Sequence, residues 1–353
     1  MREDTNTEAL ASRPDRTPPP DRSGARRVVE WLANRNSFAL VGVLFGLGLL
    51  ANRIPPLDPY DDVFFLLGGV LPIILATVST AEDGYEQEAS LAERARFVLG
   101  NLRFAVTPWG LLAQALQLAG TAGAYVRYLG RLPDRDRHVP ETRLAAPFDG
   151  EWTTVNGGVT KPTSHSWGIV SQRYAYDFLV TDDEGSTHER DGDELTDYYA
   201  YGEPVRAPAD GTVVATEDGL RDHPVPGTGW VEWRTWKIAG NHVVIEHHGG
   251  EYSLLGHLRE GSVAVEPGDE VRRGDVVGEC GNSGISTEPH LHYQCQDRRS
   301  FWFAAGLVPR FEDVDIRRDD DRRGDHEVYA ASGTDRRRYL WAGDRVASEG
   351  GRA

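Results

Sequence analysis

From about Ala145 the chain consists of short apolar runs separated by glycine, proline and aspartate. Side chains alternate between the two faces of a β-strand, so short runs with period-two or β-branched character predict strands. Five such runs lie at 211–218, 241–248, 252–258, 261–267 and 275–281. A polar, acidic stretch at 182–197 is typical of a surface loop. The pattern predicts a mainly β fold for residues 141–310, followed by a mixed-charge tail at 311–353.

Composition excludes several classes of protein. A chain of 353 residues can bury a sizeable core without covalent cross-links, and two cysteines are too few for a disulfide framework or a four-thiolate zinc site. With 55 acidic and 38 basic residues the net charge is −17, and no basic stripe stands out, so we expect no nucleic-acid partner. Only Lys161 and Lys237 are lysines. An acidic surface poor in lysine stays hydrated when salt screens its charge, which leads to the hypothesis of a halophilic host.

The N-terminal part of the chain has a different composition. Residues 1–36 are rich in proline, arginine and aspartate, which predicts a disordered tail. Two uncharged stretches follow, 15 residues at 37–51 and 19 residues at 63–81, to be compared with the roughly 20 residues that span a bilayer. The connection at 52–62 is short, proline-rich and acidic. We therefore predict a transmembrane helical hairpin at 37–81, which would make the protein integral to the cell membrane and bring it into contact with the lipid bilayer.

A third uncharged run, at 104–126, has two interpretations. Gln114, Gln117 and Thr121 form one polar helical face, while leucine and alanine form the other. Residues 82–140 therefore contain either an amphipathic helix at the membrane interface or a third spanning helix, with a linker. A third span would place the β domain on the opposite side of the membrane from the N-terminus, and arginines at both ends of the run leave the choice open. We favour an extracytoplasmic β domain.

His290 and His292 lie two residues apart in the sequence PHLHYQ. In a strand, side chains at i and i+2 point to the same face, so one imidazole can bind a metal ion while the other takes part in proton transfer. The alternative is a pair of half-exposed strand histidines. His165, Asp177 and His257 lie in the same predicted domain, and their presence favours a metal or catalytic site.

Five sequence blocks follow one another between residues 165 and 296: YAYDF, YGEPVRAPADGTVVA, NHVVIEHHGGEYSLLGHL, VEPGDEVRRGDVVGECGNSG and PHLHYQ. Together they resemble the lysostaphin-type (LytM-type) zinc metalloendopeptidases, a family with a duplicated hybrid motif. The resemblance implies an antiparallel β-sheet groove whose floor holds a zinc ion through a histidine, an aspartate and a second histidine. It also implies cleavage of peptide bonds, typically glycine-containing bonds in peptidoglycan cross-bridges.

The resemblance also assigns roles to individual residues. It implies that Asp177 and His292 are zinc ligands and that His257 and His290 are catalytic. Three protein ligands leave a fourth position for water, and bound zinc lowers the pKa of that water to about 7. The two catalytic histidines would orient or deprotonate the water and stabilise the oxyanion. The sequence contains no H-E-x-x-H motif that would supply a glutamate base, so this work falls to the histidines.

One position departs from the family pattern. The usual first zinc histidine lies four residues before the aspartate, where this chain has Arg173. Arginine stays protonated and cannot bind zinc. In one interpretation His165 completes the ligand set, which we favour because the block SHSW…QRYAYDF resembles a variant seen in some relatives. In the other, Arg173 fills the place of the metal, and the domain is an inactive module that binds a peptide or activates a partner at the membrane.

The sequence as a whole predicts a membrane-anchored zinc endopeptidase that acts on a short peptide or a cell-envelope polymer. Its catalytic residues would be His257 and His290, and its Zn²⁺ would be held by His165, Asp177 and His292. The oligomeric state is left open.

Overall fold

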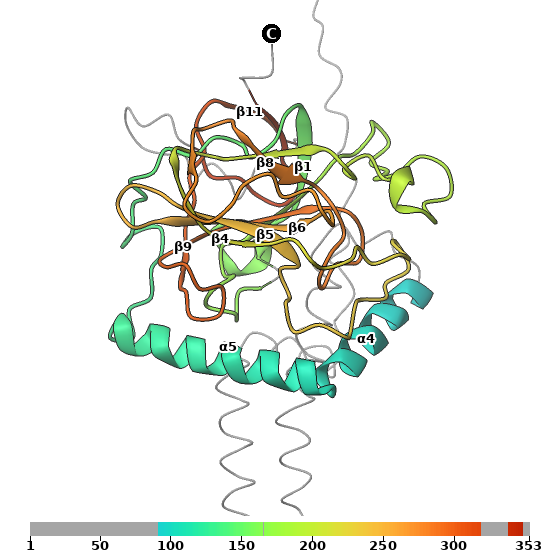
Figure 1. The fold of residues 1–353 in the computed structure, drawn as a ribbon, viewed down its shortest axis with the longest axis horizontal. Helices are drawn as coiled ribbons and strands as arrows, with labels where there is room; N and C mark the ends of the chain where they lie inside the picture. Colours follow the sequence, from blue (N-terminus) through green and yellow to red (C-terminus); the bar gives the residue numbers. More distant parts are fainter. Residues whose placement is uncertain (1–90, 165, 319–337, 349–353) are drawn as a thin grey trace, which may run out of the picture.

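The computed structural model describes residues 91–164, 166–318 and 338–348. Most of the described residues form a β domain, with two helices along one side of it (Figure 1). The mainly β prediction is therefore confirmed for this part of the chain. The predicted tail at 1–36, the predicted hairpin at 37–81 and His165 lie outside the described residues.

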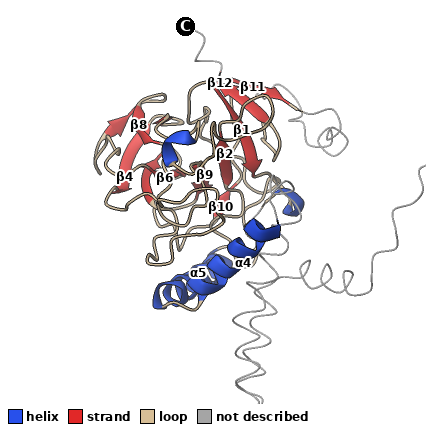
Figure 2. Cartoon of the chain, turned by 90° about the vertical axis from the view of Figure 1, so that its right-hand side faces the viewer, coloured by secondary structure: helices blue, strands red, loops and turns tan. Residues whose placement is uncertain are grey.

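Within the described residues, the main sheet has ten strands in the order β11-β12-β1-β2-β9-β6-β5-β4-β7, and β10 pairs with β9. All of these pairings are antiparallel. The strands of this sheet are β1 (Glu151–Asn156), β2 (Tyr176–Leu179), β4 (Gly211–Glu217), β5 (Asn241–Glu246), β6 (Tyr252–Leu258), β7 (Glu270–Val271), β9 (Leu291–Gln296), β10 (Gly306–Leu307), β11 (Val314–Arg317) and β12 (Arg345–Ser348). A second sheet pairs β3 (Pro204–Arg206) with β8 (Val276–Glu279), as Figure 2 shows from the side. Short 3-10 turns form at η3 (Lys161–Thr163) and η4 (Leu195–Asp197).

Four of the five predicted runs lie in strands, namely in β4, β5, β6 and β8. The run at 261–267, although wholly described, does not form a strand. Its Ala264 N–H donates a backbone hydrogen bond to the Val277 carbonyl (3.0 Å). The run ends at Pro267, which has no N–H to donate, and Gly268 has a φ of 105°, so the chain turns before β7 begins.

An aromatic cluster forms the core beside β1 and β2. Phe148, Trp152, Tyr176, Phe178 and Phe311 are all buried. The rings of Phe148 and Trp152 stack with 4.9 Å between centroids, and those of Tyr176 and Phe178 stack at 5.8 Å. Buried aromatic pairs of this kind add packing energy to the burial of their area. The cluster fixes β2, the strand that carries Asp177.

The predicted tail at 311–353 is corrected by the structure, because its described parts belong to the sheet. β11 pairs with β12, and β12 pairs with β1. Leu340 and Val346 are fully buried. Along β11, Val314 and Ile316 are partly buried and alternate with exposed charged residues. The segment therefore has a period of two, but its many charged residues obscure the apolar alternation in the sequence. The β domain extends to residue 348.

The helices are α4 (Leu91–Ala105) and α5 (Pro108–Arg127). α5 begins at a well-formed N-cap, since the Thr107 hydroxyl accepts a hydrogen bond from the Gly110 N–H (3.0 Å) and Pro108 occupies the first turn. In the part of the chain that the structure describes, no helix is both long and apolar enough to cross a membrane.

Candidate active site

Three adjacent strands, β2, β9 and β6, bring four of the predicted site residues together. Asp177 on β2 lies directly opposite His292 on β9. On the other side of β9, residue 256 of β6 lies opposite His292, so His257 is next to this position. His290 immediately precedes β9. The ring centroids of His257 and His290 are 4.6 Å apart and those of His257 and His292 are 5.7 Å apart, so the four side chains form one cluster.

Asp177 and His292 form a buried hydrogen-bonded pair. The Nδ1 of His292 lies 2.9 Å from the Oδ1 of Asp177. The second carboxylate oxygen of Asp177 accepts a hydrogen bond from the side-chain amide of Asn156 (3.2 Å). On the opposite side of the ring, His292 Nε2 lies 3.1 Å from the Oε1 of Gln294. An acceptor therefore lies at each ring nitrogen of His292, an arrangement that favours the imidazolium cation.

The pKa values in the cluster follow from this arrangement. Burial by itself lowers the pKa of His292, but the hydrogen bond and the negative charge of Asp177 raise it above its ordinary value. At His257 burial lowers the pKa well below the usual range, and the neighbouring His290 and His292 lower it further. The two histidines therefore favour opposite charge states, since Asp177 favours the cation of His292 and burial favours the neutral form of His257.

His257 is held in a strained backbone conformation that aims its ring into the cluster. Its φ is 60°, in the left-handed region that residues with a side chain seldom adopt. The register between β5 and β6 shifts at this point, between the pairs of Asn241 and Val243. Such irregularities re-aim side chains next to active sites. His257 Nδ1 donates to the Ser283 carbonyl (2.7 Å), so the lone pair of the neutral ring lies on Nε2.

A hydrogen bond from Nδ1 to a backbone carbonyl also holds the ring of His290. Its Nδ1 donates to the carbonyl oxygen of Glu288 (2.8 Å) and lies 3.1 Å from the Ser286 hydroxyl. Its Nε2 is 3.8 Å from the Oδ1 of Asp177. Thr187, in the acidic loop at 182–197, donates to the Glu288 carboxylate (2.8 Å), which links that loop to the segment holding His290. Burial raises the pKa of Glu288.

Asp177 and His292 fit part of a zinc site. A carboxylate oxygen and an imidazole nitrogen are donors that zinc accepts in proteins. An acceptor on the far nitrogen fixes the tautomer of a metal-binding histidine, and Gln294 lies in that position. Within residues 91–164, 166–318 and 338–348, no group of three or more His, Cys, Asp or Glu side chains is placed to hold a metal ion. The pair thus supplies two of the predicted donors, and His165, the third, is outside these residues.

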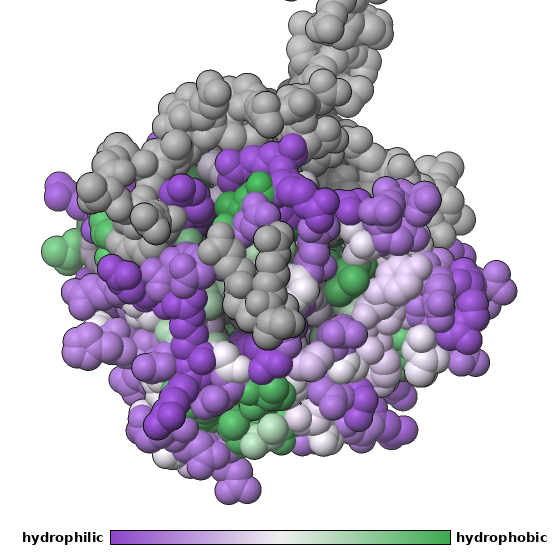
Figure 3. All heavy atoms as spheres, turned by 90° about the horizontal axis from the view of Figure 1, so that it is seen from above, coloured by the Kyte–Doolittle hydropathy of each residue, from purple (hydrophilic) through white to green (hydrophobic). Residues whose placement is uncertain are grey.

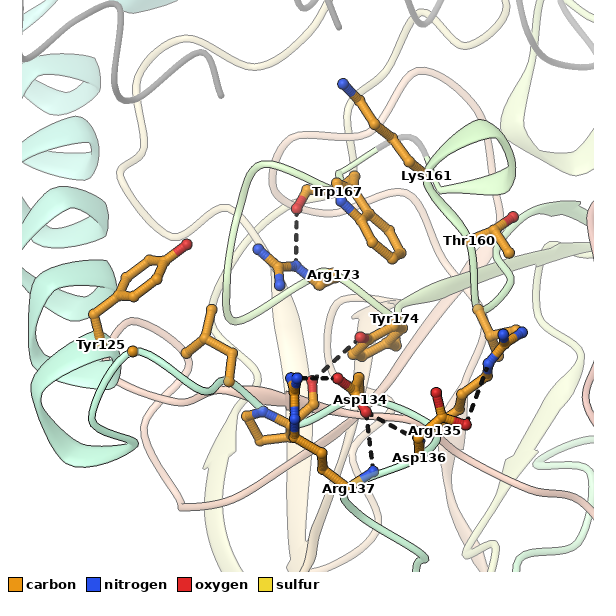
Figure 4. A pocket seen from close by; sticks show the side chains of 14 residues that line it. Tyr125, Asp134, Arg135, Asp136, Arg137, Thr160, Lys161, Trp167, Arg173 and Tyr174 are labelled. Carbon is orange, nitrogen blue, oxygen red and sulfur yellow. Dashed lines mark hydrogen bonds and ion pairs between the residues drawn. The ribbon is translucent and has the colours of Figure 1, made fainter. Parts of the chain in front are cut away.

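Arg173 lines a separate pocket of about 430 Å³ (Figure 4). Its Nε donates to the Trp167 carbonyl (3.0 Å), and its guanidinium carbon lies 5.2 Å from the centroid of the Trp167 ring. Tyr125 of α5 and Lys161 line the same pocket, and none of its described lining residues belongs to the cluster of Asp177 and the three histidines. This placement does not support the interpretation in which Arg173 fills the place of the metal.

Two residues of the cluster's surroundings were missed by sequence reasoning. Gln294 continues the period of two that begins with His290 and His292, so the alternation itself could have indicated it. Asn156 lies on β1, 21 residues before Asp177, and contacts it because β1 pairs with β2. No local pattern marks that contact.

Residues 195–301 match the profile described as "Peptidase family M23". The matched residues contain His257, His290 and His292, and Asp177 lies just upstream of them. The predicted resemblance to the lysostaphin-type family is thereby confirmed for this segment.

Curated relatives match over about a quarter of the chain. The peptidoglycan DD-endopeptidase ShyA of Vibrio cholerae is 38% identical over 93 residues, which cover 26% of this chain and 17% of the relative. The glycyl-glycine endopeptidase ALE-1 of Staphylococcus capitis is 34% identical over 94 residues, covering 26% and 21%. The DD-carboxypeptidase/endopeptidase Mpg of Neisseria meningitidis is 39% identical over 101 residues, covering 28% and 19%. The matched segment therefore spans less than a quarter of the length of each of these relatives.

Solved structures also align with the chain. The catalytic domain of lysostaphin from Staphylococcus simulans is 22% identical, with 44% of this chain and 88% of that chain covered and a TM-score of 0.28. A zinc-containing peptidase from Vibrio cholerae is 21% identical, with 51% and 44% covered and a TM-score of 0.27.

Proposed function

We propose that this protein is a zinc-dependent endopeptidase that cleaves peptide bonds in a short peptide or a cell-envelope polymer. The observation that carries the proposal is the buried Asp177–His292 pair, with Oδ1 and Nδ1 2.9 Å apart, beside two histidines whose Nδ1 atoms are fixed by backbone carbonyls. Membership of family M23 supports it. Relatives named as peptidoglycan and glycyl-glycine endopeptidases support the class of substrate.

Asp177 and His292 would hold the zinc ion, and His165 is proposed as the third ligand. When bound, zinc acts as a Lewis acid that polarises a carbonyl group and lowers the pKa of water to about 7. Gln294 would keep the proton of His292 on Nε2, so that Nδ1 presents its lone pair to the ion. Asn156 would orient the Asp177 carboxylate through its second oxygen.

His257 and His290 would carry the proton transfers. Each donates from Nδ1 to a carbonyl oxygen and therefore presents Nε2 as a proton acceptor. Burial lowers the pKa of His257 and so favours its neutral form, whose free lone pair at Nε2 can accept a proton from the attacking water. The protonated ring can then stabilise the oxyanion of the substrate and return the proton to the leaving amine.

The proposal also includes an anchor in the cell membrane and an extracytoplasmic domain. Its support is the pair of uncharged stretches at 37–51 and 63–81, in the part of the chain before α4. The halophilic host likewise remains a prediction, from the acidic and lysine-poor composition.

Zinc content tests the site directly. We would purify the full chain in detergent, with Asp177→Ala and Arg173→Ala variants, and measure bound zinc by elemental mass spectrometry. The expected result is close to one zinc per chain for the unmodified protein and for Arg173→Ala, and loss of zinc in Asp177→Ala. A fragment ending at residue 310 is unsuitable, because β11 and β12 would be removed from the sheet.

His248→Ala is the matched control, since His248 is exposed in the turn after β5 and should leave the zinc content unchanged. Cleavage of glycine-containing peptides and of peptidoglycan fragments would then be assayed with the zinc-loaded protein. Absence of zinc after reconstitution would overturn the proposal. Zinc binding that appears only in Arg173→Ala would instead support the inactive, peptide-binding module.

A further inference from the structure

We propose that the outward face of α5 rests on the surface of a lipid bilayer and fixes the M23 domain there. The outward face consists of seven exposed residues on the side of the helix away from the β domain: Leu111, Leu112, Ala115, Leu118, Ala119, Ala122 and Val126. All seven are apolar. The exposed fractions of Leu111 and Val126 are 58% and 75%.

The polarity of α5 is the reverse of that expected for a helix packed on a water-soluble domain, where the apolar stripe faces the core. Small residues make its buried side, namely Gly110, Ala113, Gly120 and Ala124. The polar side chains Gln114, Gln117 and Thr121 are partly buried. Leucine and valine face outward instead. Such a face is favourable when it meets hydrocarbon and unfavourable when it meets water.

α5 is nevertheless held firmly against the β domain, so its exposed face is a fixed part of the surface. A Cβ atom on Gly120 would lie 1.8 Å from the Trp302 carbonyl oxygen, which shows how closely the helix approaches that loop. At the end of the helix, Arg127 and Tyr128 both contact the Asp297 carboxylate, at 2.9 Å and 3.0 Å. Ala124 packs into a buried cluster with Val170 and other residues.

Exposed apolar side chains are concentrated on this side of the molecule. Nine of the fourteen large apolar side chains that are exposed in the described part lie between Leu99 and Leu129. Trp109 and Tyr125, near the two ends of α5, are the aromatic types enriched at membrane interfaces. The opposite side, seen from above in Figure 3, is mainly hydrophilic where the structure describes it. The side that carries α5 is therefore more apolar than the opposite side.

Charge on this segment matches a bilayer with anionic lipid. Residues 91–137 contain seven arginines and three carboxylates, although the whole chain has a net charge of −17. Arg103 precedes α5 and Arg131 follows it, and both are exposed. Arginines beside an apolar helical face are typical of helices that lie in the interface of anionic membranes.

The length of the segment before α4 limits how far α4 can lie from a bilayer. Nine residues, 82–90, lie between the uncharged stretch at 63–81 and Leu91, where α4 begins. Nine residues span at most about 32 Å when fully extended. If 63–81 is in a bilayer, α4 and α5 must therefore lie close to it, and the outward face is the apolar surface available to meet it.

Depth-dependent fluorescence quenching tests the proposal on the full chain. A Leu118→Cys variant would be labelled with an environment-sensitive fluorophore and reconstituted into phosphatidylcholine–phosphatidylglycerol vesicles with brominated acyl chains. The native Cys280 and Cys295 have exposures of 0% and 1%, and should not label in the folded protein. Val276→Cys is a matched control, because Val276 is 41% exposed against 42% for Leu118. It lies on β8, away from α5 in both ribbon views (Figures 1 and 2).

The expected result is a blue-shifted emission at position 118 that brominated lipid quenches at least two-fold more than at position 276. Equal, weak quenching at both positions would overturn the proposal. Protection of position 118 from aqueous iodide without quenching by brominated lipid would also overturn it, and would indicate a protein partner or a second copy. Ala122→Cys gives a second probe with a smaller change in side-chain size. None of these readouts depends on zinc or peptidase activity, so the result is independent of the proposed enzyme function.

Discussion

Asp177 and His292 are direct partners in the antiparallel register of β2 and β9, and their side chains meet at 2.9 Å in the interior of the sheet. The pairing of two central strands, and not the conformation of a loop, therefore sets their separation. Sites built on paired strands hold functional groups more precisely than sites built on loops.

Replacement of Gln294 by leucine should weaken zinc binding. The change removes the acceptor at His292 Nε2 and leaves the ring free to present the wrong tautomer. Loss of such an outer partner typically costs a factor of about 10 to 100 in metal affinity. Competition with a chelator measures the affinity, and thermal melting of the metal-free protein reports any structural effect. Gln294→Glu keeps an acceptor and should retain tighter binding than Gln294→Leu. Equal affinity in Gln294→Leu and the unmodified protein would contradict the positioning role.

Replacement of His257 by asparagine should abolish most of the peptidase activity and leave zinc bound. Asparagine tolerates the positive φ at this position better than most residues do, which limits structural damage. Loss of a general acid–base group lowers kcat by about 10²- to 10⁴-fold. Steady-state kinetics and zinc content would be measured on the same preparation. If the variant keeps kcat within a few-fold of the unmodified enzyme, His257 is not the proton acceptor.

Protonation of Glu251 should reduce the stability of the protein in acid. Burial by itself raises the pKa of this carboxyl, but hydrogen bonds from His138, Thr142 and Glu141 lower it to about 2. A lowered folded-state pKa gives stability that is complete above the unfolded value of 4.5 and is lost as the pH falls from 4.5 toward 2. The fall from 4.5 to about 2 corresponds to about 3 kcal/mol.

Urea unfolding of the detergent-purified chain at pH 6 and pH 3 would measure this loss. Glu251→Gln should reduce the difference in unfolding free energy between the two pH values. Glu260→Gln, at an exposed carboxylate nearby in the sequence, should preserve it. The same pH dependence in both variants would assign the acid sensitivity to other groups.

Two glycines of α5 should respond in opposite directions to alanine. Gly123 is exposed, and an added Cβ there meets no other atom within 4 Å, so Gly123→Ala should stabilise the helix by about 0.5–1 kcal/mol. At Gly120 the added Cβ would overlap the Trp302 carbonyl, so Gly120→Ala should destabilise the packing by about 1–3 kcal/mol. Thermal melting of the two variants gives the comparison. Stabilisation by both substitutions would show that α5 is not held against this loop.

Much of the β domain could be predicted from local pattern. The runs at β4, β5, β6 and β8 are visible as apolar segments between turn residues, because the order of apolar and polar residues along a strand reflects which of its faces is buried. β11 was missed since its alternation is hidden among charges, and its partner β12 lies about 30 residues later, beyond any local window. The period of two in PHLHYQ indicated a shared face for His290 and His292, and the structure places them in one cluster.

Local sequence pattern therefore predicted the mainly β character of the domain, the family resemblance and the residue types available for chemistry. Which residues meet depends on tertiary packing. Asn156 contacts Asp177 because β1 pairs with β2, and His257 reaches His292 because β6 pairs with β9. It also decided that the leucines of α5 face outward, since an amphipathic pattern defines two faces of a helix but not which of them meets the domain.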